Sequence, residues 1–201
     1  MRAGFYFKGE GNFSARQCRL AAGRSDWIFL GIFDKVSSSE VIKILMRKAS
    51  LCVITKDNNK QILLAMKKRG FGMGKWNGPG GKFDAQKDKT ILDTAVRETK
   101  EEIGIEPKDA QELGMISFYF PNNKEWDQDV YLYLVKNWVG EFKETEEMLP
   151  RWFNIKDIPF EDMWDDDKYW LMDILDGKKI KRASFVFEEN GRVKEHNIEF
   201  I

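Results

Sequence analysis

Hydrophobic and polar positions alternate in short runs after about residue 50, and these runs predict strands rather than long helices. Residues 51–56 and 61–66 flank the polar stretch Asp57–Lys60 and predict a β-hairpin. Near the C-terminus, the dipeptide Asn190-Gly191 predicts a second hairpin with a type I′ turn. Further strands are predicted at residues 115–120, 129–135, 151–155, 184–188 and 192–200, the first two of them half-buried.

Two segments have the periodicity of helices instead. Thr90 followed by Asp93 approximates a capping box, and Gly104 suits the left-handed position that ends a helix. A second helix is predicted at residues 169–175, after the acidic run Asp165–Asp167. Strands interleaved with two helices predict an α/β or α+β layered domain. The first helix carries an apolar stripe, interrupted by Thr99, at Ile91, Leu92, Ala95, Val96 and Ile103.

Three glutamates of the first helix, Glu98, Glu101 and Glu102, are spaced so that they share one helical face. Like charges this close repel each other unless a cation lies between them. Oxygen ligands suit a hard ion such as Mg²⁺, which takes its remaining ligands from water and phosphate. A glutamate-rich helix is more often a solvated surface, so the pattern alone leaves both interpretations open.

A glycine-rich loop at residues 70–81 precedes this helix and holds six of the sixteen glycines. Glycine lets the backbone approach a ligand closely, and its bare amides can face a phosphate. Lys67, Lys75 and Lys82 make the neighbourhood positive. Such a loop is usually only a connection, but beside the glutamate helix it becomes a candidate phosphate site.

Composition narrows the class of protein. In 201 residues, 33 Lys and Arg balance 33 Asp and Glu, so no net field selects a nucleic acid polymer or a membrane. One histidine, His196, leaves little room for zinc or histidine-based nucleophilic chemistry, and two cysteines do not make a disulfide framework. The longest apolar run, Trp27–Phe33, is too short to span a bilayer. We expect a cytoplasmic monomer acting on small molecules, with a mitochondrial or nuclear fraction as the alternative.

Residues 1–45 lack sustained periodicity, and we expect an N-terminal extension there, followed by one domain at residues 46–201. The first 24 residues carry five arginines and lysines against one acid, as mitochondrial transit peptides do. Met46 offers an alternative start. The extension is interpreted as either disordered or targeting.

The stretch from Gly81 to Ile105 resembles the Nudix box, G-x5-E-x7-R-E-U-x-E-E-x-G-U, in which U is a bulky aliphatic residue. The helical half, R-E-T-K-E-E-I-G-I from Arg97 onward, matches apart from Thr99 in the first aliphatic position. Two further departures lie in the loop, which is two residues longer than the pattern and has Lys89 where the family has Glu. We interpret them as changes to the loop geometry and the helix packing.

Outside the box, the runs M-K-K-R-G-F-G-M-G-K-W-N-G-P-G-G-K, E-M-L-P-R-W-F and I-P-F-E-D-M-W-D-D-D-K-Y-W are similar to one Nudix branch, the animal oxidised purine nucleoside triphosphatases. The resemblance implies the Nudix α/β/α sandwich, built on a mixed β-sheet. It also implies Mg²⁺-dependent hydrolysis, with Mn²⁺ as a substitute, of 8-oxo-dGTP and 2-hydroxy-dATP to the monophosphate and pyrophosphate. Such an enzyme removes damaged nucleotides from the pool before they enter DNA.

The resemblance assigns roles to individual residues as well. Arg97 would orient the glutamates, and the general base would be Glu101 or Glu102, with Glu147 as a rival. The metal ligands would be Glu98, Glu101, Glu102, Glu147 and the carbonyl of Gly80. The nucleotide would contact Cys52, Lys67, Phe71, Asn77, Pro79, Gly80, Gly81, Lys82, Phe118, Phe120, Trp164, Asp165, Asp166 and Asp167. Departures from the family at three of the pocket positions, Cys52 for threonine, Gln128 for methionine and Asp165 for proline, alter its polarity.

Asp166 and Asp167 also permit a physical argument. Two adjacent carboxylates beside an aromatic wall cannot both ionise easily, so one pKa should rise. The protonated acid donates a hydrogen bond while its ionised neighbour accepts one, and exchange of the proton would suit more than one oxidised purine. The alternative is that the run Asp165–Asp167 only caps the following helix.

Two other functions remain open from the sequence. One is a Nudix pyrophosphatase for another nucleoside diphosphate compound, such as an ADP-ribose or a dinucleoside polyphosphate. The other is a non-catalytic nucleotide-binding module, which Lys89 and the longer loop make conceivable. The intact three-glutamate face argues against the second, because a simple binding protein has no need to keep repelling carboxylates together.

Overall fold

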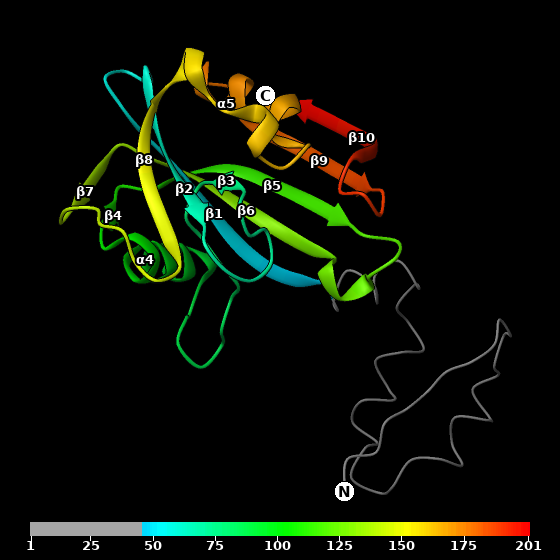
Figure 1. Ribbon diagram of the computed structural model, residues 1–201, viewed down its shortest axis with the longest axis horizontal. Helices are drawn as coiled ribbons and strands as arrows, with labels where there is room; N and C mark the ends of the chain where they lie inside the picture. Colours follow the sequence, from blue (N-terminus) through cyan, green and yellow to red (C-terminus); the bar gives the residue numbers. More distant parts are fainter. Residues whose placement is uncertain (1–45) are drawn as a thin grey trace, which may run out of the picture. The chain divides into compact units, whose positions relative to one another are not determined.

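An eight-stranded β-sheet organises residues 46–201, the part of the chain that the computed structural model describes (Figure 1). Our interpretation of residues 1–45 lies outside the described residues. Along the sheet the strands follow the order β10-β9-β5-β6-β1-β2-β3, and β8 pairs with β2. The strands are β1 (Arg47–Lys56), β2 (Gln61–Lys67), β3 (Trp76–Asn77), β5 (Gln111–Tyr119), β6 (Gln128–Val135), β8 (Met148–Asn154), β9 (Ile180–Phe187) and β10 (Val193–Phe200).

The sheet is mixed, which confirms the predicted fold class. β1 runs parallel to β6, with Leu51 opposite Leu132, and β5 runs parallel to β9. The other pairings are antiparallel, including the predicted hairpin of β1 and β2 and the closing hairpin of β9 and β10. Two short strands, β4 (Glu106–Lys108) and β7 (Asn137–Val139), form a separate two-stranded sheet that the alternation did not predict.

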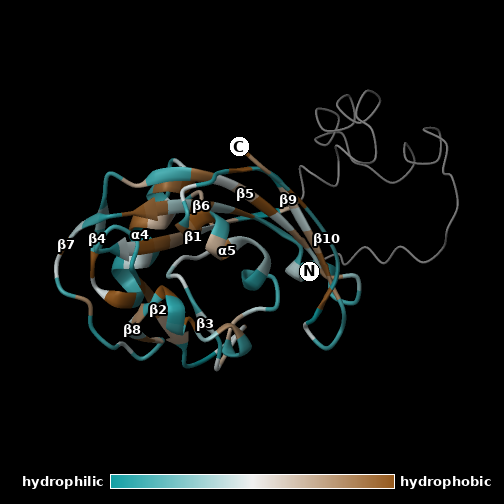
Figure 2. Ribbon diagram, turned by 90° about the horizontal axis from the view of Figure 1, so that it is seen from above, coloured by the Kyte–Doolittle hydropathy of each residue, from teal (hydrophilic) through white to brown (hydrophobic). Residues whose placement is uncertain are grey.

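Two helices cover opposite faces of the sheet. α4 (Ile91–Ile103) packs against Cys52 and Ile54 of β1. α5 (Asp167–Leu175) packs against the other face, where the intervening Val53 lies. Because successive side chains of a strand point to opposite faces, the apolar run of β1 serves both helices. Figure 2 shows these apolar strands enclosed by more polar loops. Neither helix of the described residues is long and apolar enough to cross a membrane.

The burial of β6 corrects one expectation. We predicted a half-buried strand at residues 129–135, but six of the eight residues of β6 are buried. Val130 and Leu132 belong to the core on the α5 face, whereas Tyr133 and Val135 belong to the core on the α4 face. A central strand covered on both sides has no solvent face, so its sequence need not alternate.

The ends of α4 confirm the sequence prediction. The Thr90 side chain accepts a hydrogen bond from the Asp93 amide, and the Asp93 carboxylate accepts one from the Thr90 amide. Gly104 ends the helix in the left-handed conformation, with φ of 88°. The predicted apolar face needs correction, however. Leu92 is exposed, whereas Thr99 is fully buried and its hydroxyl donates to the Cys52 sulfur at 3.4 Å.

The turn between β9 and β10 is also not the predicted one. A type I′ turn requires positive φ at both central residues, and of Asn190 and Gly191 only Gly191 has it. The Gly191 amide donates to the Glu188 carbonyl, and the Glu188 amide donates to the Arg192 carbonyl. The connection is therefore a three-residue loop in which Gly191 takes the left-handed position.

The sheet opens where the glycine-rich loop enters it. β1 and β2 pair only at their hairpin end, from Ile54 opposite Leu63 to Lys56 opposite Gln61. Beyond that point, residues 76–82 run between the two strands. Trp76 and Asn77 pair with β2 as β3, and the carbonyls of residues 79 and 81 accept hydrogen bonds from β1 amides. This split places the loop beside α4.

Candidate active site

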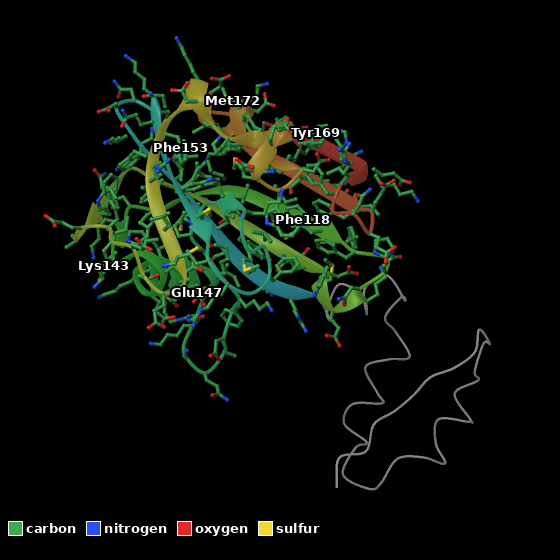
Figure 3. All side chains as sticks on the ribbon, viewed as in Figure 1. Phe118, Lys143, Glu147, Phe153, Tyr169 and Met172 are labelled. Atoms are coloured by element: carbon green, nitrogen blue, oxygen red, sulfur yellow. The ribbon has the colours of Figure 1, made fainter. Side chains whose placement is uncertain are left out.

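A cavity of about 620 Å³ lies at the opening of the sheet. Its wall combines charged groups from α4, from β2 and from Glu147, just before β8, with aromatic rings and a pair of aspartates from the start of α5. Figure 3 shows Glu147 beside α4 and Phe118 farther along the sheet. Among the predicted site residues, the cavity is lined by Lys67, Phe71, Asn77, Gly80, Gly81, Lys82, Glu98, Phe118, Phe120, Glu102, Glu147, Trp164, Asp166 and Asp167.

Lys67 joins two of the predicted carboxylates. Its ammonium lies 3.1 Å from Oε1 of Glu102 and 2.7 Å from Oε1 of Glu147. The hydrogen bond from Lys67 lowers the pKa of Glu147. Burial raises the pKa of Glu102, which is 4 % exposed, although Gly80 and Lys67 act in the other direction. Burial lowers the pKa of Lys67 itself, but the two carboxylates outweigh it and the net direction is upward.

Arg97 gathers a second set of carboxylates. Its Nη1 lies 2.6 Å from Glu98 Oε1 and 3.2 Å from Glu101 Oε2. On its other edge, Nε and Nη2 bind both oxygens of Asp88 at 2.8 and 2.7 Å. Arg97 thus contacts two of the predicted glutamates and does not line the cavity. Glu101 is more than half exposed and does not line the cavity.

The glycines of the loop bring its backbone against these carboxylates. The Gly80 amide donates to Oε2 of Glu102 at 3.0 Å. A Cβ atom on Gly81 would lie 2.4 Å from the Glu98 carboxyl carbon, and one on Gly80 would lie 2.1 Å from the Ser50 carbonyl oxygen. Both positions therefore require glycine for close approach. The sequence predicted that glycine lets this loop approach a ligand closely, and the structure shows that the groups next to Gly80 and Gly81 are the Ser50 carbonyl and the Glu98 carboxylate.

The donor set suits a hard divalent cation. Glu98, Glu102 and Glu147 share the cavity wall, and carboxylates are the ligands that such ions prefer. Ser50 is also among the residues that line the cavity, and its buried hydroxyl has no hydrogen-bond partner among residues 46–201. Within the same residues, no three acidic, histidine or cysteine side chains are already gathered around one point. The Lys67 ammonium lies between Glu102 and Glu147, so it must move for a metal ion to bind these two carboxylates together.

The aspartate pair is placed quite differently. Asp166 and Asp167 are 4 % and 2 % exposed and have only neutral hydrogen-bond donors. Trp170 Nε1 donates to Asp166 at 2.9 Å, and the Trp164 amide donates to Asp167 at 3.1 Å. Burial raises the pKa of Asp166 to about 6, and burial together with the adjacent Asp166 charge raises the pKa of Asp167 well above its ordinary value. The predicted rise is therefore present.

The alternative that this run merely caps α5 is not supported. Asp166 occupies the N-cap position but its side chain makes no capping hydrogen bond. Asp167 bonds backward to Trp164 instead of forward into the helix. Asp165 has a separate task, since its carboxylate accepts hydrogen bonds from Lys168 and from the Val193 amide of β10. Asp165 does not line the cavity.

Aromatic rings surround the aspartate pair. Phe71 stacks on Trp164 with 4.9 Å between ring centroids, and Phe120 stacks on Phe187 at the same separation. Phe118 stacks on the buried Phe185. Flat apolar walls of this kind suit a planar ring, and they remove water from the two carboxylates.

Two other predicted contacts lie outside the cavity. Cys52 is fully buried on the α4 side of the sheet, where burial raises the pKa of its thiol to about 12. Such a thiol stays protonated and does not act as a nucleophile. Pro79 contributes its carbonyl to β1 through the Cys52 amide. Asn77 does line the cavity, and its side-chain oxygen accepts from the Gly78 amide.

Two residues near the site were not identified from the sequence, and a third, Lys75, was named only as one of the loop's positive charges. Asp88 binds Arg97. The only feature of the sequence that could have indicated it is that Asp88 is an acid in the lengthened loop, one residue before Lys89. Lys75 lines the cavity and donates to the Met163 carbonyl at 2.9 Å. Trp126 packs on Phe71 at 4.8 Å although it is distant in sequence, and no local pattern indicates that contact.

A mixed sheet between two helices, with a glutamate-bearing helix facing a glycine-rich loop, is the architecture of a family of hydrolases. The NUDIX domain model matches residues 46–174, and the chain belongs to the Nudix family. Enzymes of this family generally use divalent metal ions and act on small nucleotide substrates.

Particular relatives narrow the comparison. The chain is 40 % identical over 139 residues to the oxidized purine nucleoside triphosphate hydrolase of Mus musculus, covering 69 % of this chain and 86 % of the relative. It is 41 % identical over the same shares to the protein of that name from Danio rerio. A MutT protein from Bacillus halodurans has the same fold, with a TM-score of 0.65 at 22 % identity, covering 77 % of this chain and 98 % of that one.

Proposed function

We propose that this protein hydrolyses oxidised purine nucleoside triphosphates, 8-oxo-dGTP and 2-hydroxy-dATP among them, to the monophosphate and pyrophosphate with Mg²⁺. The mouse and zebrafish relatives carry the name of this activity, and they match most of the described domain. The observation that carries the proposal is the aspartate pair, because it puts two buried, weakly compensated carboxylates in the wall of the same cavity as the glutamates.

The aspartate pair provides a proton for base recognition. With a raised pKa, one acid of the pair keeps its proton near neutral pH and donates a hydrogen bond, while the other accepts one. An oxidised purine differs from its parent in the donors and acceptors at its edge. A proton that moves between Asp166 and Asp167 matches more than one such pattern, whereas a fixed pair of ionised carboxylates matches only donors.

The rings beside the pair would hold the base between flat surfaces. Trp164 is the proposed stacking residue, with Phe71, Phe118 and Phe120 as the apolar lining. A planar base on an aromatic face gains stacking energy and displaces water from the acids. Lys67 and the amides of residues 80–82 would lie near the phosphates, which are the charged part of the substrate.

Glu98, Glu102 and Glu147, with the Gly80 carbonyl, are the residues that would hold Mg²⁺. When bound, the ion supplies neutralisation of phosphate charge and a template for the attacking water. Glu102 is the proposed general base, because it lines the cavity whereas Glu101 is paired with Arg97 outside it. Arg97 holds Glu98 and Glu101 by one hydrogen bond each and does not itself line the cavity.

A pyrophosphate-release assay tests this function. The substrates would be dGTP, 8-oxo-dGTP, dATP and 2-hydroxy-dATP, each with Mg²⁺, with Mn²⁺ and with EDTA. Cleavage of ADP-ribose, which releases no pyrophosphate, would be followed under the same conditions by chromatography of the products AMP and ribose 5-phosphate. We expect kcat/KM for the oxidised purines to exceed that for the normal ones by roughly tenfold or more, since a buried hydrogen-bonding site rejects ligands that leave it unpaired. A preference for ADP-ribose would assign the chain to another Nudix substrate class. Metal-independent binding without product release would make it a binding module.

A further inference from the structure

The guanidinium of Arg97 is fully engaged by its neighbours. An arginine side chain has five N–H donors in a rigid fork. Nε and Nη2 bind the two oxygens of Asp88, and Nη2 also reaches the Lys82 carbonyl at 3.3 Å. The two N–H groups of Nη1 are left for Glu98 and Glu101. Five donors therefore meet five acceptors.

Asp88 is itself held in a fixed position. Its side chain is 1 % exposed, and Oδ2 accepts hydrogen bonds from the Thr94 hydroxyl at 2.9 Å and the Asp84 amide at 3.1 Å. The hydrogen bond from Arg97 holds the pKa of Asp88 well below its ordinary value. The hydrogen bonds from the loop amide and from the α4 hydroxyl thus hold the Asp88 carboxylate in place, and this carboxylate in turn holds the Arg97 guanidinium.

This arrangement limits what Arg97 can do to the glutamates. A free guanidinium prefers to bind one carboxylate with two parallel hydrogen bonds. Because Asp88 occupies that edge of the fork, Glu98 and Glu101 receive one N–H each. Oε2 of Glu98 and Oε1 of Glu101 accept no hydrogen bond from residues 46–201. An oxygen of Glu98, which lines the cavity, stays available for a cation.

We propose that Asp88 is a positioning residue that occupies the fork of Arg97 and so leaves the Glu98 carboxylate free to bind a divalent cation. The inference deepens the proposed function and rests on it for the identity of the site. It also explains both departures from the sequence pattern in the loop. Lys89 occupies the position at which the pattern has an acid. Its side chain is exposed, and its backbone amide donates a hydrogen bond to the Asp93 carboxylate at the start of α4. The longer loop brings the preceding residue, Asp88, to Arg97 instead.

The test is a double-mutant cycle between Asp88→Asn and Arg97→Met, read by metal binding to the nucleotide-free protein. Mg²⁺ affinity would come from titration calorimetry and Mn²⁺ affinity from the loss of the free-ion electron paramagnetic resonance signal. In Asp88→Asn, the released guanidinium can bind both oxygens of Glu98. We expect the metal dissociation constants to rise about tenfold, as is usual when a residue that orients a ligand is removed.

In the Arg97→Met background the same Asp88→Asn change should alter metal affinity less than twofold, because Asp88 acts through Arg97. It should also recover part of the melting temperature that Arg97→Met loses, since an unpaired buried carboxylate is removed. Asp84→Asn is the matched control: Asp84 lies in the same loop and does not touch Arg97, so metal affinity should stay at the wild-type value.

Equal effects of Asp88→Asn in both backgrounds, or a lower melting temperature with unchanged metal affinity, would overturn the proposal and leave Asp88 a structural residue. Should Asp88→Asn fail to fold, Asp88→Glu carries the test, because it keeps the charge and moves it by one methylene. We then expect a higher metal dissociation constant than in the wild type, and an unchanged dissociation constant would refute the positioning role of Asp88. The function proposed above fails separately, if the wild-type protein binds metal but releases no pyrophosphate.

Discussion

Two groups of carboxylates at or beside the same cavity differ in the partners that surround them. Near α4, Arg97 and Lys67 lie within hydrogen-bonding distance of Glu98, Glu101, Glu102 and Glu147. At the start of α5, the buried Asp166 and Asp167 have only neutral donors. Identical side-chain chemistry therefore meets cationic partners in one place and only neutral hydrogen-bond donors in the other.

The difference follows from what lies beside each carboxylate, because burial and neighbouring charge shift a pKa in opposite directions. A paired carboxylate is ready to exchange its cation for a metal ion. An unpaired, buried one favours its neutral form and becomes a hydrogen-bond donor. In the proposed function, the glutamates near α4 hold the metal ion that binds the triphosphate, and the protonated aspartate pair donates a hydrogen bond to the neutral base. The two groups of carboxylates would therefore recognise different parts of one nucleotide.

Replacing Glu102 with Gln should give the largest effect. The change keeps the shape of the side chain but removes the charge that faces Lys67 and the Gly80 amide. Turnover of 8-oxo-dGTP should fall by roughly 10²–10⁴-fold if Glu102 binds the ion or acts as base. Steady-state pyrophosphate release measures it, and circular dichroism checks that the variant is folded.

Glu106→Gln is the matched control for that change, since Glu106 of β4 pairs with Lys100 and Lys108 and lies outside the cavity. Its turnover should match the wild type. If Glu102→Gln retained wild-type activity, the glutamates near α4 would not form the catalytic group.

Replacing Asp167 with Asn should produce a smaller, more selective loss. Asn can donate and accept, but it cannot exchange a proton with Asp166. We expect kcat/KM for 8-oxo-dGTP to fall roughly tenfold to 100-fold, the cost of one unmatched buried hydrogen bond. Metal affinity, measured by calorimetry, should be unchanged, and this would separate the aspartate pair from the glutamates.

The exposed Asp162, five residues earlier, provides the control variant Asp162→Asn, which should leave the kinetics unaltered. An equal loss of metal affinity in Asp167→Asn would show that the two carboxylate groups do not act separately.

The parts predicted correctly from the sequence depend on local interactions. The caps of α4 involve residues three apart, and the spacing of the glutamates follows from helical geometry alone. Periodicity likewise located the longer strands. The two-residue β3 and the three-residue β4 and β7 are too short to show a period.

The missed contacts join segments that are distant in sequence or depend on the path of a loop. Lys67 and Glu147 are 80 residues apart, and β2 and β8 bring them together only because these strands pair. Asp88 lies in the loop whose lengthened form departs from the family pattern. Asp165 looked identical to its two neighbours in sequence, yet its carboxylate faces β10 rather than the cavity.

The pH dependence of stability should show the smallest effect and can be tested without substrate. The Asp166 pKa rises from 3.8 to about 6 on folding, so between these values the folded protein binds more protons than the unfolded chain. The contribution of Asp166 to stability should therefore become less favourable as pH rises from 4 to 7, and Glu102 and Asp167, whose pKa values are also raised, contribute in the same direction. Asp166→Asn removes one such group and should flatten the curve by on the order of 2–3 kcal/mol. Urea unfolding at pH 4, 5, 6 and 7 measures this change, with Asp162→Asn expected to follow the wild-type curve. An unaltered slope in Asp166→Asn would mean that the buried acid carries no excess proton, and the contrast between the two carboxylate groups would then be wrong.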